Sequence, residues 1–187
     1  ARYRSDEQSG LDKKTPLLIL GNKIDLSDAA SEESIMQTLE LDQYPEIDYS
    51  LKNEIFEYLK EAGYKVKDLG NKVYEKGDDY PDFAFKVAKK VAEKDTMGIL
   101  FCGSGVGVCI SANKIRGIRA VNASNIKVAE ISRKHNDSNI LCLGQDFVGP
   151  ELSKEIIDVW LNTPFSGINR HKGRVEKIQM FERGISE

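Results

Sequence analysis

The sequence predicts a doubly wound, Rossmann-like α/β fold: a three-layer sandwich in which helices cover both faces of a five-stranded parallel sheet. From residue 49 onwards, segments with helical spacing of apolar residues alternate with short apolar runs that are typical of buried strands. A glycine-rich turn at residues 103–107 joins one of these runs to the next helix. This alternation requires right-handed crossovers between parallel strands, which place helices on both faces of the sheet.

Two parts of unequal length are expected. In the N-terminal extension, residues 1–45, a short apolar run at residues 16–21 ends in glycine, as a buried strand does. A short helical pattern at residues 35–41 leads to an acidic, proline-containing segment at residues 42–48, which marks the boundary. The main domain, residues 46–187, follows.

Within the main domain, helices and strands alternate along the chain. The expected helices cover residues 51–62, 83–94, 106–113, 126–133 and 150–160, and the expected strands cover residues 64–69, 97–102, 118–121 and 139–143. A doubly wound sheet holds its site beyond the carboxyl ends of its strands. The residues that follow Phe101, Val121 and Leu143 are therefore the first candidates for function.

The composition favours a packed domain whose partner is a small molecule or a second copy of itself. The chain has 187 residues, 40% of them hydrophobic, with 27 Lys+Arg against 30 Asp+Glu and a net charge of −3. This balance gives no general attraction to nucleic acid or to anionic membranes. The three cysteines are an odd number without CxxC spacing, which favours reduced thiols. With no apolar run near the roughly 20 residues that span a bilayer, we expect a cytoplasmic protein.

The strongest chemical signal is the run Phe-Cys-Gly-Ser-Gly-Val-Gly at residues 101–107. Its alternate glycines, Gly103, Gly105 and Gly107, let backbone N–H groups approach an anion, and the helix that follows adds its positive end. The thiolate form of Cys102 would gain from the same dipole. The alternative interpretation is a tight turn beside an inert, buried cysteine.

Two other polar clusters are candidates for binding or proton transfer. Arg170 and Arg174 are four residues apart, so on one helical face they present paired guanidinium groups to a phosphate, or else form a solvated basic surface. His135 lies at a helix end, where it either caps the helix or acts as an acid. Together the clusters indicate acid–base chemistry on a phosphorylated small molecule. We expect no metal, because the two histidines and dispersed cysteines lack ligand spacing, and no cofactor, because no GxGxxG motif with a later acidic partner is present.

Residues 49–181 resemble the family of sugar-phosphate isomerases that contains type B ribose-5-phosphate isomerase and galactose-6-phosphate isomerase. The shared motifs are Asp-Tyr-Pro at 79–81, the run from Gly98 to Gly107, Ala-Asn-Lys at 112–114, Gly-Ile-Arg-Ala at 117–120, His-Asn-Asp at 135–137, Gly-Pro-Glu-Leu at 149–152 and Arg-His at 170–171. The His-Asn-Asp and Arg-His motifs favour the ribose-type branch.

The resemblance implies interconversion of ribose 5-phosphate and ribulose 5-phosphate through a cis-enediolate, without metal or organic cofactor. It implies that Cys102 is the base, that Ser104 and the glycine amides stabilise the enediolate oxygen, and that His135 helps to open the sugar ring. The further substrate-binding residues it implies are Tyr80, Gly103, Gly105, Gly107, Asn113, Asn136, Arg170 and Arg174. In this family two subunits share the site, so a homodimer is implied.

The chain departs from the family pattern at two points. No Asp-His pair precedes Tyr49, although the family normally has one after its first strand. Asp146 stands where a basic residue is expected, and its carboxylate would repel a phosphate. Two alternatives therefore stay open: a catalytically impaired homologue that binds sugar phosphates, and an isomerase of a phosphorylated hexose.

Residues 16–41 resemble the guanine-recognition strand and helix of Arf-like small GTPases, with Asn22 and Asp25 in an NKxD motif. The chain has no GxxxxGK[ST] phosphate loop, so we expect no GTP binding. The resemblance implies a fusion in which residues 17–20 supply the first strand of the isomerase sheet. The remaining alternative is an interaction module derived from a GTPase.

Overall fold

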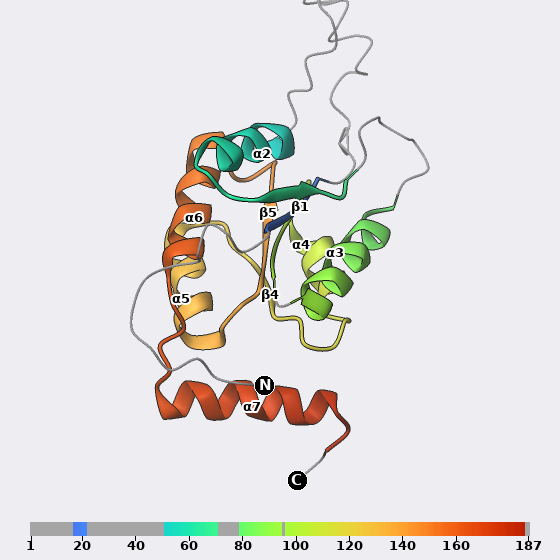
Figure 1. The fold of residues 1–187 in the computed structure, drawn as a ribbon, viewed down its shortest axis with the longest axis vertical. Helices are drawn as coiled ribbons and strands as arrows, with labels where there is room; N and C mark the ends of the chain where they lie inside the picture. Colours follow the sequence, from blue (N-terminus) through green and yellow to red (C-terminus); the bar gives the residue numbers. More distant parts are fainter. Residues whose placement is uncertain (1–16, 22–50, 71–78, 95, 186–187) are drawn as a thin grey trace, which may run out of the picture.

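A computed structural model describes residues 17–21, 51–70, 79–94 and 96–185. These residues form one parallel sheet in the order β2-β1-β3-β5-β4, with helices on both of its faces (Figure 1). The strands are β1 (Leu17–Gly21), β2 (Val66–Asp68), β3 (Met97–Cys102), β4 (Ala120–Asn122) and β5 (Ile140–Gly144). The helices are α2 (Leu51–Glu61), α3 (Tyr80–Lys94), α4 (Val106–Ala112), α5 (Ile126–Asn136), α6 (Pro150–Asn162) and α7 (Asn169–Glu182). The predicted Rossmann-like α/β class is confirmed.

The two faces of the sheet form two separate cores, because successive side chains of a strand point to opposite faces. One core joins Ile99, Phe101, Leu141 and Leu143 to residues of α2, α5 and α6. The other joins Leu100, Cys102, Ile140 and Cys142 to residues of α3 and α4. The side chain of Cys102 therefore lies on the face that α3 and α4 cover.

Several element boundaries differ from those expected. α3 begins at Tyr80, three residues early, because Pro81 fits the first turn of a helix, where its missing N–H breaks no hydrogen bond. α5 continues to Asn136, three residues beyond its expected end, so His135 lies inside the last turn. No described helix is long and apolar enough to cross a membrane.

The strand expected at residues 16–21 is present as β1, in the interior of the sheet. Leu17 pairs with Val66 of β2 on one side and with Met97 of β3 on the other. The sheet of the main domain thus includes a strand from the N-terminal extension. The expected helix at residues 35–41, the boundary segment at 42–48, and Asn22 and Asp25 lie outside the described residues.

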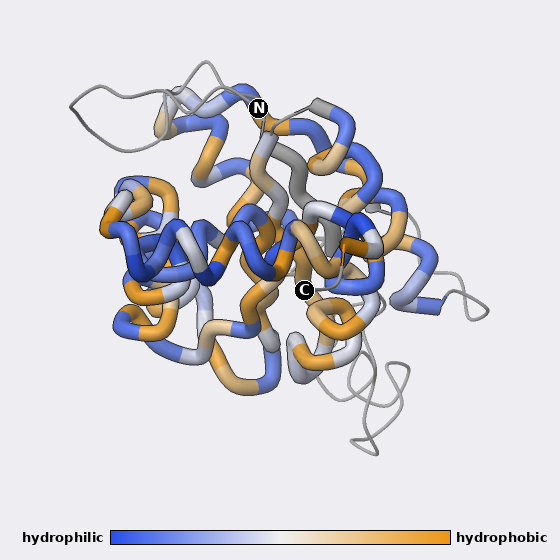
Figure 2. The backbone as a smooth tube through the Cα atoms, turned by 90° about the horizontal axis from the view of Figure 1, so that it is seen from below, coloured by the Kyte–Doolittle hydropathy of each residue, from blue (hydrophilic) through white to orange (hydrophobic). Residues whose placement is uncertain are grey.

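The two ends of the sheet carry different elements. Cys102 and Gly144 stand opposite each other at the carboxyl ends of β3 and β5. α5 starts beyond the carboxyl end of β4 and ends at Asn136, four residues before β5 begins, so its last turn lies at the amino end of the sheet. α7 lies across this same end, at the bottom of Figure 1, and Figure 2 shows from below that most of its residues are hydrophilic.

Candidate active site

Cys102 is the last residue of β3, and its side chain is buried at the start of the glycine loop. The N–H of Gly105 donates a hydrogen bond to its Sγ at 3.0 Å. The chain can turn back onto the sulfur because Gly105 has a φ of 76°, which a glycine adopts without steric cost. The loop therefore aims a backbone dipole at the thiol, as the sequence predicts.

Glycines are required here because the loop packs too tightly for side chains. A Cβ on Gly105 would lie 2.4 Å from Oδ1 of Asn122, and a Cβ on Gly107 would lie 2.7 Å from Cζ of Tyr80. The ring of Tyr80, at the start of α3, therefore lies directly against the glycine loop. The structure thus brings Tyr80 to Gly107 of the glycine loop, although the two are far apart in the sequence.

Asn122 is a residue of the loop's surroundings that the sequence analysis did not select. Its Nδ2 donates to the backbone oxygen of Ser104 at 3.2 Å and so supports the loop from the end of β4. Its place directly after Val121, at a strand end, was the available signal. A hollow of about 220 Å³ opens beside it; the lining residues are Ser104, Val106, Asn122, Ala123, Ser124, Gly144, Phe147 and Val148.

Asp146 is tied to the glycine loop through its backbone. Its N–H donates to the oxygen of Gly103 at 3.1 Å, and the N–H of Gln145 donates to the oxygen of Cys102 at 3.0 Å. The residue is exposed. The acidic position that departs from the family pattern is therefore next to the loop that carries Cys102.

A second cluster surrounds His135 and His171, whose ring centroids are 4.2 Å apart. His171 is buried, and its Nδ1 lies 2.7 Å from Oγ of Ser166. Nε of Arg170 donates to Nε2 of His171 at 3.2 Å. Because an arginine only donates, Nε2 accepts, and the ring proton of neutral His171 lies on Nδ1, facing Ser166.

The surroundings of His171 favour the neutral form of its ring. Burial lowers the pKa of His171, and the neighbouring His135, Arg170 and Arg174 lower it further. Arg170 and Arg174 lie on the first two turns of α7 and are exposed, as a phosphate-binding pair requires. His171 was named in the sequence only as part of a motif, and its role becomes visible because the fold buries it between these groups.

Asn113 has a structural role in this chain, and its predicted contact with sugar hydroxyls stays a prediction. Its Nδ2 donates to the oxygens of Cys109 and Ala120, at 3.0 and 2.9 Å, and its Oδ1 accepts from the N–H of Ala120 at 2.9 Å. All its amide groups are therefore used to join the end of α4 to the start of β4. Asn136, by contrast, stays next to His135 at the end of α5.

The predicted site residues form two groups at opposite ends of the sheet. Cys102, Ser104, Tyr80 and the glycines lie at the carboxyl end, and His135, Asn136, Arg170 and Arg174 lie at the amino end. β3 has six residues, so its ends are about 17 Å apart at the usual rise of a strand. One protomer therefore does not close both groups around one small ligand. Among the described residues, no cluster of His, Cys, Asp or Glu is arranged to hold a metal ion.

Comparisons with known proteins identify the family. Residues 45–178 match the model of the Ribose/Galactose Isomerase family. Ribose-5-phosphate isomerase B of Escherichia coli is 46% identical over 138 residues, which are 73% of this chain and 91% of that protein. Probable ribose-5-phosphate isomerase B of Mycoplasma genitalium is 44% identical over 137 residues, which are 72% of this chain and 89% of that protein.

Solved structures give the same result. Ribose-5-phosphate isomerase B of Clostridium thermocellum has a TM-score of 0.72 at 37% identity, covering 91% of this chain and 99% of its own. The enzyme of Mycoplasma genitalium with bound ribulose 5-phosphate has a TM-score of 0.73 at 36% identity, covering 90% of this chain and 96% of its own. These matches do not support the likeness of residues 16–41 to a GTPase. The chain belongs to the Ribose/Galactose Isomerase family.

Proposed function

We propose that this chain is an aldose–ketose isomerase that interconverts ribose 5-phosphate and ribulose 5-phosphate. The observation that carries the proposal is the buried thiol of Cys102 at the head of a glycine loop, with the N–H of Gly105 on its sulfur at 3.0 Å. The relatives named ribose-5-phosphate isomerase B, and the related structure with bound ribulose 5-phosphate, support this choice of substrate.

In the proposed reaction, Cys102 acts as the base on the open-chain sugar. The thiolate removes the proton from C2 of the aldose, the C1 carbonyl oxygen takes the negative charge, and a cis-enediolate forms. Ser104 and the amides of the glycine loop stabilise that oxygen. The protonated thiol returns its proton to C1 while the proton of the C2 hydroxyl is transferred to the C1 oxygen, so that C2 becomes the carbonyl, C1 carries the hydroxyl and the ketose results.

Ring opening and phosphate binding fall to the second group of residues. His135 transfers the proton between the C1 hydroxyl and the ring oxygen that opens the furanose, and Asn136 contacts a hydroxyl. Arg170 and Arg174 bind the phosphate with charge-assisted hydrogen bonds. Because these residues lie at the far end of the sheet from Cys102, we infer that they act with the glycine loop of a second copy, in a homodimer.

The proposal does not fix the number of carbon atoms in the sugar phosphate. One relative, 41% identical over 133 residues, is named D-erythrulose-4-phosphate isomerase, so proteins this similar differ in the sugar they are named for. No residue of either group measures the length of the carbon chain. Ribose 5-phosphate, a tetrose 4-phosphate and a hexose 6-phosphate therefore belong in the same assay.

The deciding experiment is a coupled assay of ketose formation from ribose 5-phosphate, with the Cys102→Ala variant beside it. We expect turnover by the wild type and its loss in the variant. Calorimetric binding of ribose 5-phosphate without turnover would instead identify the impaired, sugar-phosphate-binding homologue. Turnover of the hexose phosphate alone would overturn the choice of substrate and leave the reaction class intact.

A further inference from the structure

We propose that Asp137 is a positioning residue: its carboxylate holds two arginines that fix the helix end carrying His135 and Asn136. The inference rests on the proposed function, in which these two neighbours contact the sugar. Asp137 follows Asn136 directly and ends α5 in a left-handed conformation, with a φ of 48°. It is the one residue other than glycine with a positive φ in the described part of the chain.

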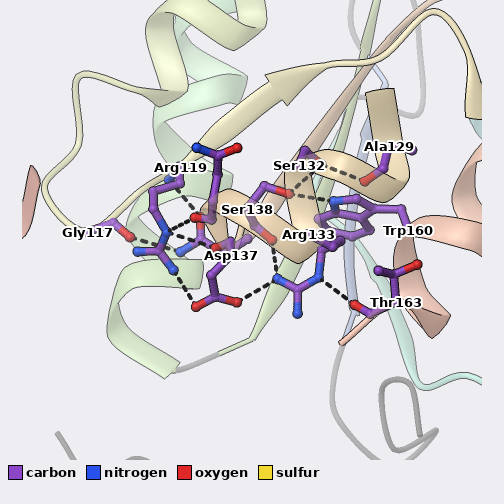
Figure 3. Close-up of polar contacts among 11 residues, drawn as sticks. Gly117, Arg119, Ala129, Ser132, Arg133, Asp137, Ser138, Trp160 and Thr163 are labelled. Atoms are coloured by element: carbon purple, nitrogen blue, oxygen red, sulfur yellow. Dashed lines mark hydrogen bonds and ion pairs between the residues drawn. The ribbon is translucent and has the colours of Figure 1, made fainter. Parts of the chain in front are cut away.

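The carboxylate of Asp137 receives two guanidinium groups from different elements (Figure 3). Oδ2 pairs with Nη2 of Arg119, just ahead of β4, and Oδ1 pairs with Nη1 of Arg133 in α5, both at 2.9 Å. Both arginine side chains are only 15% exposed and the Asp137 side chain is 35% exposed, so these ion pairs are partly shielded from solvent. We call Asp137, Arg119 and Arg133 the arginine clamp.

Arg119 also holds the backbone of the same turn. Its Nε donates to the oxygen of Asn136 at 2.9 Å and to the oxygen of Asp137 at 2.8 Å. The last carbonyls of a helix have no partner inside the helix, so an arginine that binds them fixes where the helix ends. Asp137 keeps the guanidinium of Arg119 in the orientation that makes these contacts.

Arg133 connects the turn to the segment that leads to α7. Its Nε donates to the oxygen of Thr163 at 3.3 Å, and its guanidinium also donates to the oxygen of Ser138. The N–H of Ser166 donates to the oxygen of Lys134, one residue before His135. The clamp therefore holds the end of α5 against the segment that presents His171, and so sets how the two imidazole rings contact each other.

Without the carboxylate of Asp137, two guanidinium groups would face each other in a partly buried place. Their repulsion would separate Arg119 from Arg133 and release the backbone that Arg119 holds. His135 sits two residues from Asp137, so a small shift of this turn moves the imidazole relative to the sugar. A displacement of about 1 Å in an active site can cost about 10²-fold in rate.

The test uses Asp137→Asn, which keeps the shape of the side chain and the tolerance for a left-handed backbone. Asparagine offers one oxygen, so it accepts from one arginine and turns an NH₂ donor toward the other. We expect kcat with ribose 5-phosphate to fall by about 10- to 100-fold, with KM changed less than twofold, because Arg170 and Arg174 keep the phosphate.

A proton NMR measurement reads the position of His135 directly. The chain has only two histidines, so its imidazole region contains two sets of signals, which His135→Gln assigns. In the wild type, the rings of His135 and His171 have centroids 4.2 Å apart, so their protons give a nuclear Overhauser cross-peak. We expect Asp137→Asn to weaken this cross-peak and shift the His135 signals while the circular dichroism stays native.

Glu130→Gln is the matched control, since it removes a carboxylate from the same helix that pairs with two lysines, Lys127 and Lys134. It should leave the imidazole signals and kcat unchanged. Arg119→Lys is the second variant: it keeps the charge opposite Asp137 and loses the fork that binds two backbone oxygens, so it should reproduce the effect of Asp137→Asn. The proposal is overturned if both clamp variants fold and keep the cross-peak and kcat, or if neither folds.

The two proposals fail in different ways. If Cys102→Ala or His135→Gln leaves isomerisation intact, the proposed site is wrong, whatever the clamp does. If both of these variants lose activity and Asp137→Asn behaves like the wild type, only the positioning role of Asp137 is lost.

Discussion

At the scale of single residues, the position of a cysteine in the fold identifies the proposed base better than the pKa of its thiol does. A hydrogen bond with Cys142 lowers the pKa of the Cys109 thiol, while burial raises the pKa of Cys142. A lowered pKa alone would therefore select Cys109. Cys102 is the thiol that the glycine loop faces, with the N–H of Gly105 on its sulfur. Cys109 lies in α4 beyond the loop, half-buried against the core that contains Cys142.

We therefore predict that Cys102→Ala lowers kcat by about 10²- to 10⁴-fold, the usual contribution of a general base. The fold should stay intact, because alanine is a smaller apolar residue at a strand end. Cys109→Ala is the matched control and should cost little activity. A coupled isomerase assay with both variants decides the matter, and equal losses would mean that the wrong thiol has been named.

Replacement of Asp146 by arginine is predicted to increase the affinity for ribose 5-phosphate. Its backbone is bonded to Gly103, and its exposed carboxylate lies beside the loop where an anionic substrate is expected to bind. We predict that Asp146→Arg lowers KM for ribose 5-phosphate by about tenfold, with little change in kcat, because contact with a non-reacting phosphate acts equally on ground and transition states. Steady-state kinetics measure this. An unchanged KM would place Asp146 outside the substrate pocket.

The residues that carry motifs were predictable, and those whose role comes from contacts were not. The glycine loop could be read from the sequence because alternate glycines after an apolar strand have few other uses. The resemblance assigned Asn113 to the substrate, which stays a prediction, and nothing in the sequence indicated that its amide joins α4 to β4. The place of Asn122 at a strand end was visible in the sequence, but its contact with Ser104 and the burial of His171 depend on which strands and helices become neighbours, which local patterns do not show.

At the scale of elements, α5 and α7 contact each other through His135 and His171. Because His171 is buried, this contact is sensitive to acid. His171 accepts a hydrogen bond from Nε of Arg170 through Nε2. Protonation of that nitrogen would replace an acceptor by a donor facing a cation. The pKa of His171 is lowered for the same reasons, burial and nearby positive groups.

This lowered pKa predicts a loss of stability on acidification. Between the unfolded pKa of about 6.5 and the lower folded value, the unfolded chain binds more protons, so the free energy of unfolding falls as the pH falls. His171→Gln removes this contribution. Urea unfolding at about pH 7.5 and pH 5.5 should show a larger drop in midpoint for the wild type than for the variant. Equal drops would contradict the prediction.

Among the elements, periodicity predicted the buried helices well and gave no bounds for α7. α6 packs Ile156, Ile157 and Trp160 into the core, and its apolar spacing was visible. α7 buries only His171 and Val175, so its helix carries little apolar pattern. A helix that buries few side chains has a weak periodicity of apolar residues in its sequence.

At the scale of the whole molecule, α7 has apolar side chains that no other part of the described chain covers. Phe181 is 81% exposed and Ile178 is 45% exposed. Together with the separation of the two groups of site residues, this supports the proposal that a second copy covers α7. Sedimentation at micromolar concentration should then show a dimer, and Phe181→Asp should weaken it.

A complementation experiment tests whether two copies share each site. The Cys102→Ala protein lacks the base at the carboxyl end of the sheet, and the Arg174→Ala protein lacks a phosphate contact at the amino end. If each site combines the glycine loop of one copy with the arginines of the other, a mixed dimer contains one intact site and one doubly defective site. Neither variant alone contains an intact site.

Subunits that exchange freely form mixed dimers as about half of an equimolar mixture. With one intact site in each, we predict recovery of about a quarter of the wild-type activity after the two inactive proteins are mixed, partly unfolded together and refolded. The same treatment of either protein alone should recover none. If the two groups act within one chain instead, every chain of the mixture carries one defect, and the mixture stays as inactive as its components.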